Sequence, residues 1–193
     1  MVNNFIMNKD NINKILNNIE EDIKYVETIS NDIVNRKTKD LDELMRAIQA
    51  EIVDIEEPSD KIIEKYFLEL TNALYFINAY CEGLGFYDDI SKSNAKLAYN
   101  KAYSENQISN TLKNVKVTVN DNVLFAENAS LDETIVNLIY NRSFKIIKVK
   151  IDQANEMVKT LSKVLSSRMS DKQLTGMSGN KYLNINEVKG DTF

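Results

Sequence analysis

An uninterrupted amphipathic segment from Ser130 to Met169 constrains the fold more than any other part of this sequence. No proline or glycine follows Ser130 until Gly176. The segment opens on a serine with a glutamate three residues later, Glu133, which is the spacing of a helix-capping box. About forty helical residues rise about 60 Å, so such a rod packs on other long helices or on another chain. The sequence therefore predicts an all-α protein, an extended helical bundle with one very long C-terminal helix.

The same segment carries a heptad repeat of apolar residues. Spacings of four and three alternate along what we term the heptad seam: Tyr140, Phe144, Ile147, Ile151, Ala154, Val158, Leu161 and Leu165. The helix is expected to touch two neighbours, one of them the chain's own third or fourth predicted helix and the other a second copy, because further apolar residues lie off this seam: Ile135, Leu138, Ile139, Ile146, Val149 and Met157. We predict a homo-oligomer whose interface includes five seam residues: Ile147, Ile151, Val158, Leu161 and Leu165.

Shorter helices are predicted upstream, because apolar residues recur there at spacings of three and four. These helices cover about residues 10–35, 41–55, 59–81 and 90–114. A polar break over 36–40 separates the first two. Ser59 is predicted to cap the third helix, and Gly83 and Gly85 to end it. Residues 115–126 lose the helical rhythm, and their Val-Thr-Val, Asn-Asp-Asn and Val-Leu-Phe triplets predict a short β-hairpin or a loop excursion.

Charge divides the chain into unlike halves. Residues 1–89 hold nine Lys and Arg against nineteen Asp and Glu, whereas residues 90–193 hold fifteen against ten. This asymmetry indicates an anionic partner for the basic half or self-association of unlike faces; two solvated surfaces that differ by drift are the alternative. We predict an acidic N-terminal helical region over 1–58, a helical core with the long C-terminal helix over 59–170, and a flexible tail over 171–193.

The composition argues against an enzyme. The chain has no histidine, the commonest general base and metal ligand. Its single cysteine, Cys81, therefore lacks an imidazole to activate it and fits a small buried hydrophobe in a reducing cytoplasm. Residues 83–85 lack the lysine and third glycine of a phosphate loop. No stretch is apolar enough to span a membrane, and residues 1–10 lack the features of a secretory signal. We expect no catalytic residue, no cofactor, no metal and no membrane partner.

Lysines and tyrosines share one face of the helix predicted over 90–114. Lys92, Lys96, Tyr99 and Tyr103 follow one another at four, three and four. Bases stack on aromatic rings while ammonium groups neutralise phosphates, and non-specific single-strand binders combine the two. Packing of the rings on a neighbouring helix is the structural alternative. The predicted nucleic-acid-binding residues, including three from the long helix, are Lys92, Lys96, Tyr99, Lys101, Tyr103, Arg142, Lys145 and Lys148.

The layout of these elements resembles the recombination mediators of T4-like phages. The segment Ala95–Ser104, AKLAYNKAYS, resembles their lysine-rich helix with paired aromatic residues, and the long C-terminal helix resembles their assembly helix. The resemblance covers roughly Asp60–Lys172; the acidic N-terminal half and the lower basic content depart from it. It implies a phage protein of the bacterial host cytoplasm that binds single-stranded DNA and assembles subunits into a ring through its last helix.

Two classes of function are compatible with these features. The first is a phage-type accessory protein, recombination mediator-like, that binds single-stranded nucleic acid. The second is a non-enzymatic protein–protein interaction module, such as a virion assembly component or an inhibitor of a host defence complex, whose acidic N-terminal helices dock on a basic partner surface. Oligonucleotide binding that weakens steeply as salt rises distinguishes the first class, because phosphate contacts release counterions.

Overall fold

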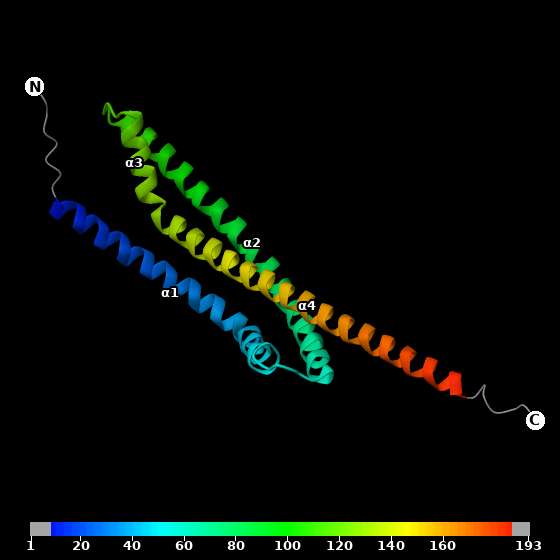
Figure 1. Ribbon diagram of the computed structural model, residues 1–193. Helices are drawn as coiled ribbons and strands as arrows, with labels where there is room; N and C mark the ends of the chain where they lie inside the picture. Colours follow the sequence, from blue (N-terminus) through cyan, green and yellow to red (C-terminus); the bar gives the residue numbers. More distant parts are fainter. Residues whose placement is uncertain (1–8, 187–193) are drawn as a thin grey trace, which may run out of the picture. The chain divides into compact units, whose positions relative to one another are not determined.

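The protein is built from long helices joined by short connections (Figure 1). The computed structural model describes the backbone of residues 9–186 and the side chains of residues 20–174. The elements are α1 (Lys9–Ile48), a short π-helix η1 (Gln49–Val53), α2 (Asp60–Leu112), α3 (Val119–Ala129) and α4 (Leu131–Asn186). No strand occurs in this part of the chain. The predicted all-α class with a very long C-terminal helix is confirmed.

The helix α1 continues through the polar segment 36–40, where the sequence predicts a break. Thr38 is fully buried, and the Lys37 ammonium lies 5.1 Å from the centroid of the Tyr80 ring on α2. These contacts hold polar side chains against a neighbouring helix, and they stabilise the helical conformation of the segment. The predicted break is therefore wrong. The helix gives way to η1 instead, where the Asp54 N–H donates to the Gln49 carbonyl oxygen at 2.9 Å.

The helix α2 likewise joins two helices that the sequence predicts as separate. It begins as expected, with the Ile62 N–H 3.4 Å from Ser59 Oγ, which confirms the serine as a cap. Gly83 and Gly85 lie inside the helix, and neither has the positive φ of a helix-ending glycine. A Cβ added at Gly85 would lie 3.2 Å from the Phe144 ring. This glycine therefore allows a close approach of α4 and does not end the helix.

A helix start replaces the hairpin that is one of the two predictions for residues 115–126. The Thr118 hydroxyl and N–H donate to the Asp121 carboxylate at 2.8 and 3.1 Å, and the Asp121 N–H donates back to Thr118 Oγ1 at 3.2 Å. These bonds from Thr118 lower the pKa of Asp121. The capping box starts α3 at Val119, so only the short stretch 115–118 matches the loop alternative.

The capping box predicted at Ser130 does not form. Ser130 separates α3 from α4, and its N–H donates to the Ala126 carbonyl oxygen at 3.1 Å. Its hydroxyl donates to the same oxygen at 2.9 Å. Because the Ser130 N–H already donates to a backbone oxygen of α3, it is not free to donate to the Glu133 carboxylate. The helix α4 then continues beyond the predicted end at Met169, to Asn186. Residues 187–193 of the predicted tail lie outside the described residues.

The chain forms two compact units, each built from segments that are far apart in sequence. Among the described residues, unit 1 comprises residues 9–38 and 78–149, and unit 2 comprises residues 39–77 and 150–186. Within unit 1, α2 and α4 run antiparallel, since Gly85 faces Phe144 while Asp88 bonds to Asn137 at 3.0 Å. Unit 2 has its own apolar core from three helices, whose buried members include Leu41, Ile48, Ile63, Leu70, Ile151 and Leu161.

Asp60, the first residue of α2, ties this helix to α4 within unit 2. Its carboxylate accepts from Arg168 Nη1 at 2.9 Å and from Lys172 Nζ at 2.5 Å. Arg168 Nη1 also donates to the Pro58 carbonyl oxygen at 2.5 Å. The bonds from Lys172 and Arg168 hold the pKa of Asp60 below its ordinary value.

The lowered pKa of Asp60 predicts an acid-sensitive contact. Because folding depresses this pKa, the stabilisation is present above the ordinary value of 3.8 and is lost as pH falls through the lowered pKa. We expect the Asp60 carboxyl to titrate below 3.8 in a carbon-detected NMR titration of the folded chain. Asp60→Asn should remove that part of the acid sensitivity of the melting temperature. Titration of Asp60 at or above its ordinary value would contradict the tie.

Candidate nucleic-acid interface

Four of the predicted binding residues lie on one face of α2, which we term the Lys/Tyr face: Lys92, Lys96, Tyr99 and Tyr103. Their spacing of four, three and four brings them to the same side of a regular helix. The Tyr99 and Tyr103 rings are stacked, with centroids 6.4 Å apart and planes 23° apart. Both tyrosines are half-buried, whereas Lys92 and Lys96 are exposed. The face therefore offers two ammonium groups to solvent beside a pair of aromatic rings.

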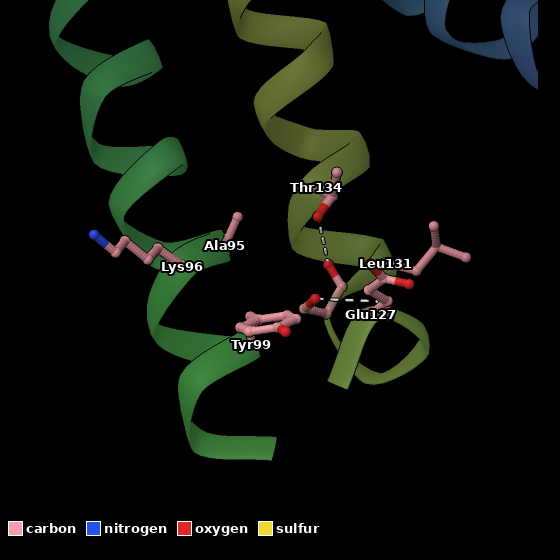
Figure 2. Close-up of a pocket in the computed structure, with 7 residues that line it drawn as sticks. Ala95, Lys96, Tyr99, Glu127, Leu131 and Thr134 are labelled. Carbon is pink, nitrogen blue, oxygen red and sulfur yellow. Dashed lines mark hydrogen bonds between the residues drawn. The ribbon is translucent and has the colours of Figure 1, made fainter. Parts of the chain in front are cut away.

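Tyr99 forms one wall of a hollow of about 420 Å³ between α2 and the junction of α3 with α4. Figure 2 shows the Tyr99 ring extending from α2 toward that junction, while the Lys96 side chain extends away from it. Ligand sites in proteins occupy roughly 300–1,000 Å³, so this hollow is at the small end of that range. Its lining consists of Ala95, Lys96, Tyr99, Glu127, Ser130, Leu131 and Thr134.

The polar groups of the hollow are mainly acceptors. The Ser130 hydroxyl donates to the Ala126 carbonyl oxygen, and the Thr134 hydroxyl donates to the Ser130 carbonyl oxygen at 2.8 Å. Both protons are thus used within the helices. A dashed line in Figure 2 marks the bond of Thr134. The Glu127 side chain is exposed and adds a carboxylate. An aromatic wall with acceptors around it suits a flat group that carries N–H donors.

The other predicted binding residues do not join the Lys/Tyr face. Lys101 lies nine residues beyond Lys92, which is half a turn around the helix, and pairs with Glu105 at 4.0 Å. Arg142 Nη2 lies 2.7 Å from Glu27 Oε1 on α1. Two further residues complete this list: Lys145, which lines a separate groove between α1 and α4, and Lys148, which is exposed on α4.

The predicted oligomer-interface residues lie largely inside the chain itself. Ile147 is 0% exposed in unit 1, and Ile151 and Leu161 are buried in unit 2. Val158 and Leu165 are half-buried. Ile147, Ile151 and Leu161 are thus core residues that the chain's own helices cover, whereas Val158 and Leu165 keep part of their surface accessible.

Sequence reasoning missed the wall of the hollow that faces Tyr99. Glu127, Ser130 and Thr134 come from α3 and the start of α4, where the sequence predicts an excursion and a capping box. A signal was present, since Thr118 and Asp121 have the spacing of a capping box. That spacing predicts a helix over 119–129, and the structure places the end of this helix beside Tyr99.

Two other kinds of site do not occur in the part of the chain that the structure describes. Residues 9–186 contain no helix with the length and apolarity needed to cross a membrane. In the same range, no three His, Cys, Asp or Glu side chains gather as metal ligands. No protein-family model, no curated protein and no solved structure matches the chain.

Proposed function

We propose that this chain binds single-stranded nucleic acid through the Lys/Tyr face of α2, as a recombination mediator-like accessory protein. One observation carries the proposal. The Tyr99 ring forms a wall of the hollow, and the Lys96 side chain extends from α2 away from the hollow (Figure 2). An aromatic ring at a hollow can stack on a base while a cation nearby contacts the phosphate of the same nucleotide.

The chemistry of the lining suits a base in the hollow and a backbone outside it. A base stacked on an aromatic ring contributes about 1–3 kcal/mol, largely independent of sequence. The carboxylate of Glu127 can accept from the amino group of a base, and it repels phosphate. Phosphates are therefore expected on the side of Lys92 and Lys96. The overall net charge of −5 opposes binding, so the interaction should be weak and strongly dependent on salt.

Neutralising one lysine on each side of α2 tests this proposal. Lys96→Gln should weaken binding of a fluorescent single-stranded oligonucleotide about fivefold at moderate salt and reduce the salt slope by about 0.7, the value of one phosphate contact. Lys101→Gln makes the same chemical change on the opposite side of the helix and should leave both values unchanged. Fluorescence anisotropy measured over a range of salt concentrations reports both quantities.

Substitutions of the ring separate stacking from charge. Tyr99→Phe keeps a ring at the hollow and should retain affinity, whereas Tyr99→Ala should lose about tenfold, in line with one lost stacking contact. Absence of binding by the unaltered chain at low salt would refute the proposal. Equal losses in Lys96→Gln and Lys101→Gln would show that binding does not use the Lys/Tyr face.

A second candidate, a protein–protein interaction module, is favoured by the outer face of α2. Five large apolar side chains recur there at successive spacings of four, seven, eleven and four residues. These spacings keep them on one side of a straight helix. All are at least 40% exposed, and patches of this kind commonly mark interfaces. Their members within unit 1 are Phe86, Ile90, Leu97, Ile108 and Leu112. A virion assembly component or an inhibitor of a host defence complex would use such a surface, and failure of the oligonucleotide assay would leave this class standing.

A further inference from the structure

The hollow beside Tyr99 has room for one flat ring stacked on the tyrosine. The Tyr99 ring is stacked with the Tyr103 ring, which precludes a second partner on that side. The hollow extends the other way, toward the preceding turn of α2, because Ala95 and Lys96 line it and Tyr103 does not (Figure 2). Ala95 carries only a methyl group, so this side of the Tyr99 ring is open to a base.

The opposite wall of the hollow is held in place by buried polar contacts. Asn106 Nδ2 on α2 donates to Asn122 Oδ1 on α3 at 2.8 Å, and Asn122 is buried. The buried Ser130 hydroxyl donates to the Ala126 carbonyl oxygen at 2.9 Å and holds the junction of α3 with α4. Both walls belong to unit 1, so the hollow is formed before a ligand binds, as is usual for small-molecule sites.

The hydrogen-bonding groups of this wall are available as acceptors. The Ser130 and Thr134 hydroxyl protons are used within the helices, so these two oxygens can only accept further hydrogen bonds. The Glu127 carboxylate makes no ion pair or hydrogen bond with any other residue of 20–174, the range whose side chains the structure describes. Both of its oxygens are therefore available to a ligand in the hollow that Glu127 lines.

Of the four DNA bases, guanine is the one whose edge matches a carboxylate. Its N1–H and its N2 amino group are donors that lie side by side, and a carboxylate offers two acceptors side by side. Adenine and cytosine set a ring-nitrogen acceptor next to their amino group, and thymine sets a carbonyl oxygen on each side of its N–H. Each of these three bases therefore places a lone pair against the second carboxylate oxygen, which disfavours it.

We infer that the hollow beside Tyr99 binds a guanine base, which stacks on the Tyr99 ring and donates from N1–H and the N2 amino group to the Glu127 carboxylate. The guanine belongs to a single strand or to a free guanine nucleotide, since both present the same edge. For a single strand, the inference rests on the proposed function and adds base specificity to it. Glu127 is then the residue that determines this specificity.

Filling the hollow tests where the base binds. Ala95→Leu extends a side chain into the space beside the Tyr99 ring and should weaken binding of a fluorescent thymidine pentanucleotide with dG at its centre about tenfold, the effect of one lost stacked base. The hollow has room for the added atoms, so the melting temperature should not fall. Asn94→Leu adds a leucine at an exposed neighbouring position and should leave the affinity unchanged. Unchanged affinity of Ala95→Leu for the dG strand would overturn the inference.

Strands that differ in one amino group test the role of Glu127. By fluorescence anisotropy, the pentanucleotide with central dG should bind about fivefold more tightly than one with deoxyinosine, which keeps N1–H and lacks the N2 amino group. Glu127→Gln should bring the two strands within about twofold, because an amide offers one acceptor and one donor. Asp132→Asn removes the same charge at an exposed residue outside the hollow and should leave the ratio unchanged.

Free nucleotides distinguish this inference from the proposed function. Guanosine 5′-monophosphate should shift the amide NMR signals of Ala95 and Ser130 more than inosine 5′-monophosphate does at equal concentration. Equal affinity for the two strands, or a dG preference that survives Glu127→Gln, would overturn the inference and leave the proposed function standing. Shifts by the free guanine nucleotide without strand binding would support the inference and refute the proposed function. Absence of both would overturn both.

Discussion

Ile147→Ala is expected to lower the free energy of unfolding by about 2–5 kcal/mol, the usual range for truncating a fully buried aliphatic side chain. Ile147 is 0% exposed and belongs to the core of unit 1. The substitution removes three carbons from a site that surrounding helices fill, so a cavity remains. Urea unfolding followed by circular dichroism measures the loss, and the value should not depend on protein concentration, because the missing contacts lie within one chain.

The matched control for this substitution is Ile108→Ala. Ile108 lies on the outer face of α2 and is 60% exposed, so the same chemical change removes little buried area. Alanine also has a higher helix propensity than isoleucine, so the net change should stay below about 1 kcal/mol. A small effect of Ile147→Ala, or a loss that disappears at high protein concentration, would show that the heptad seam is an interface between chains and not a core.

The sequence shows that α4 has apolar residues on two sides, but it does not show which side the chain covers itself. The heptad seam is longer and better filled, which favours it as the oligomer interface when residues are considered alone. The structure places Ile147, Ile151 and Leu161 in the chain's own core. The distinction depends on where α1 and α2 pack, and that information is spread over residues far apart in the chain.

Glycine and asparagine signals account for two of the other errors in the predicted fold. A glycine after an apolar run can end a helix or allow the close approach of a neighbouring helix, and both depend on the absence of a Cβ. Only the position of Phe144 beside Gly85 decides between them. The Asn-Asp-Asn triplet suggests a hairpin turn, yet Asp121 within it completes a capping box with Thr118. Local patterns of this kind support two structures, and tertiary contacts select one.

Helix periodicity explains which part of the candidate site could be predicted. The Lys/Tyr face follows directly from spacings of three and four on α2. The same arithmetic places Lys101 half a turn away from Lys92, so the sequence alone shows that this predicted binding residue does not share the face. The pairing of Arg142 with Glu27 could not be predicted from the sequence, because these residues are 115 positions apart and meet only through the packing of α1 on α4.

The contact between α1 and α4 in unit 1 depends on small side chains. Ser30 and Ser143 are both fully buried, and the Ser30 hydroxyl lies 3.4 Å from the Ile139 carbonyl oxygen. The Ser143 hydroxyl donates to the same oxygen at 2.7 Å and lies 3.5 Å from the Ser30 carbonyl oxygen. These distances bring the backbones of the two helices close together and leave no room for a larger side chain at either serine.

Ser143→Leu is therefore expected to destabilise the chain by about 3 kcal/mol or more, since a branched side chain must force the two helices apart. Ser143→Ala keeps the volume and loses hydrogen bonds that the serine makes to backbone oxygens, so it should cost only about 1 kcal/mol. The control is Ser166→Leu, because Ser166 is exposed on the same helix and makes the equivalent bond to the Ser162 carbonyl oxygen at 2.9 Å. Thermal and urea unfolding should rank Ser143→Leu far below both. Equal stability of the two leucine variants would show that α1 and α4 do not meet closely at Ser143.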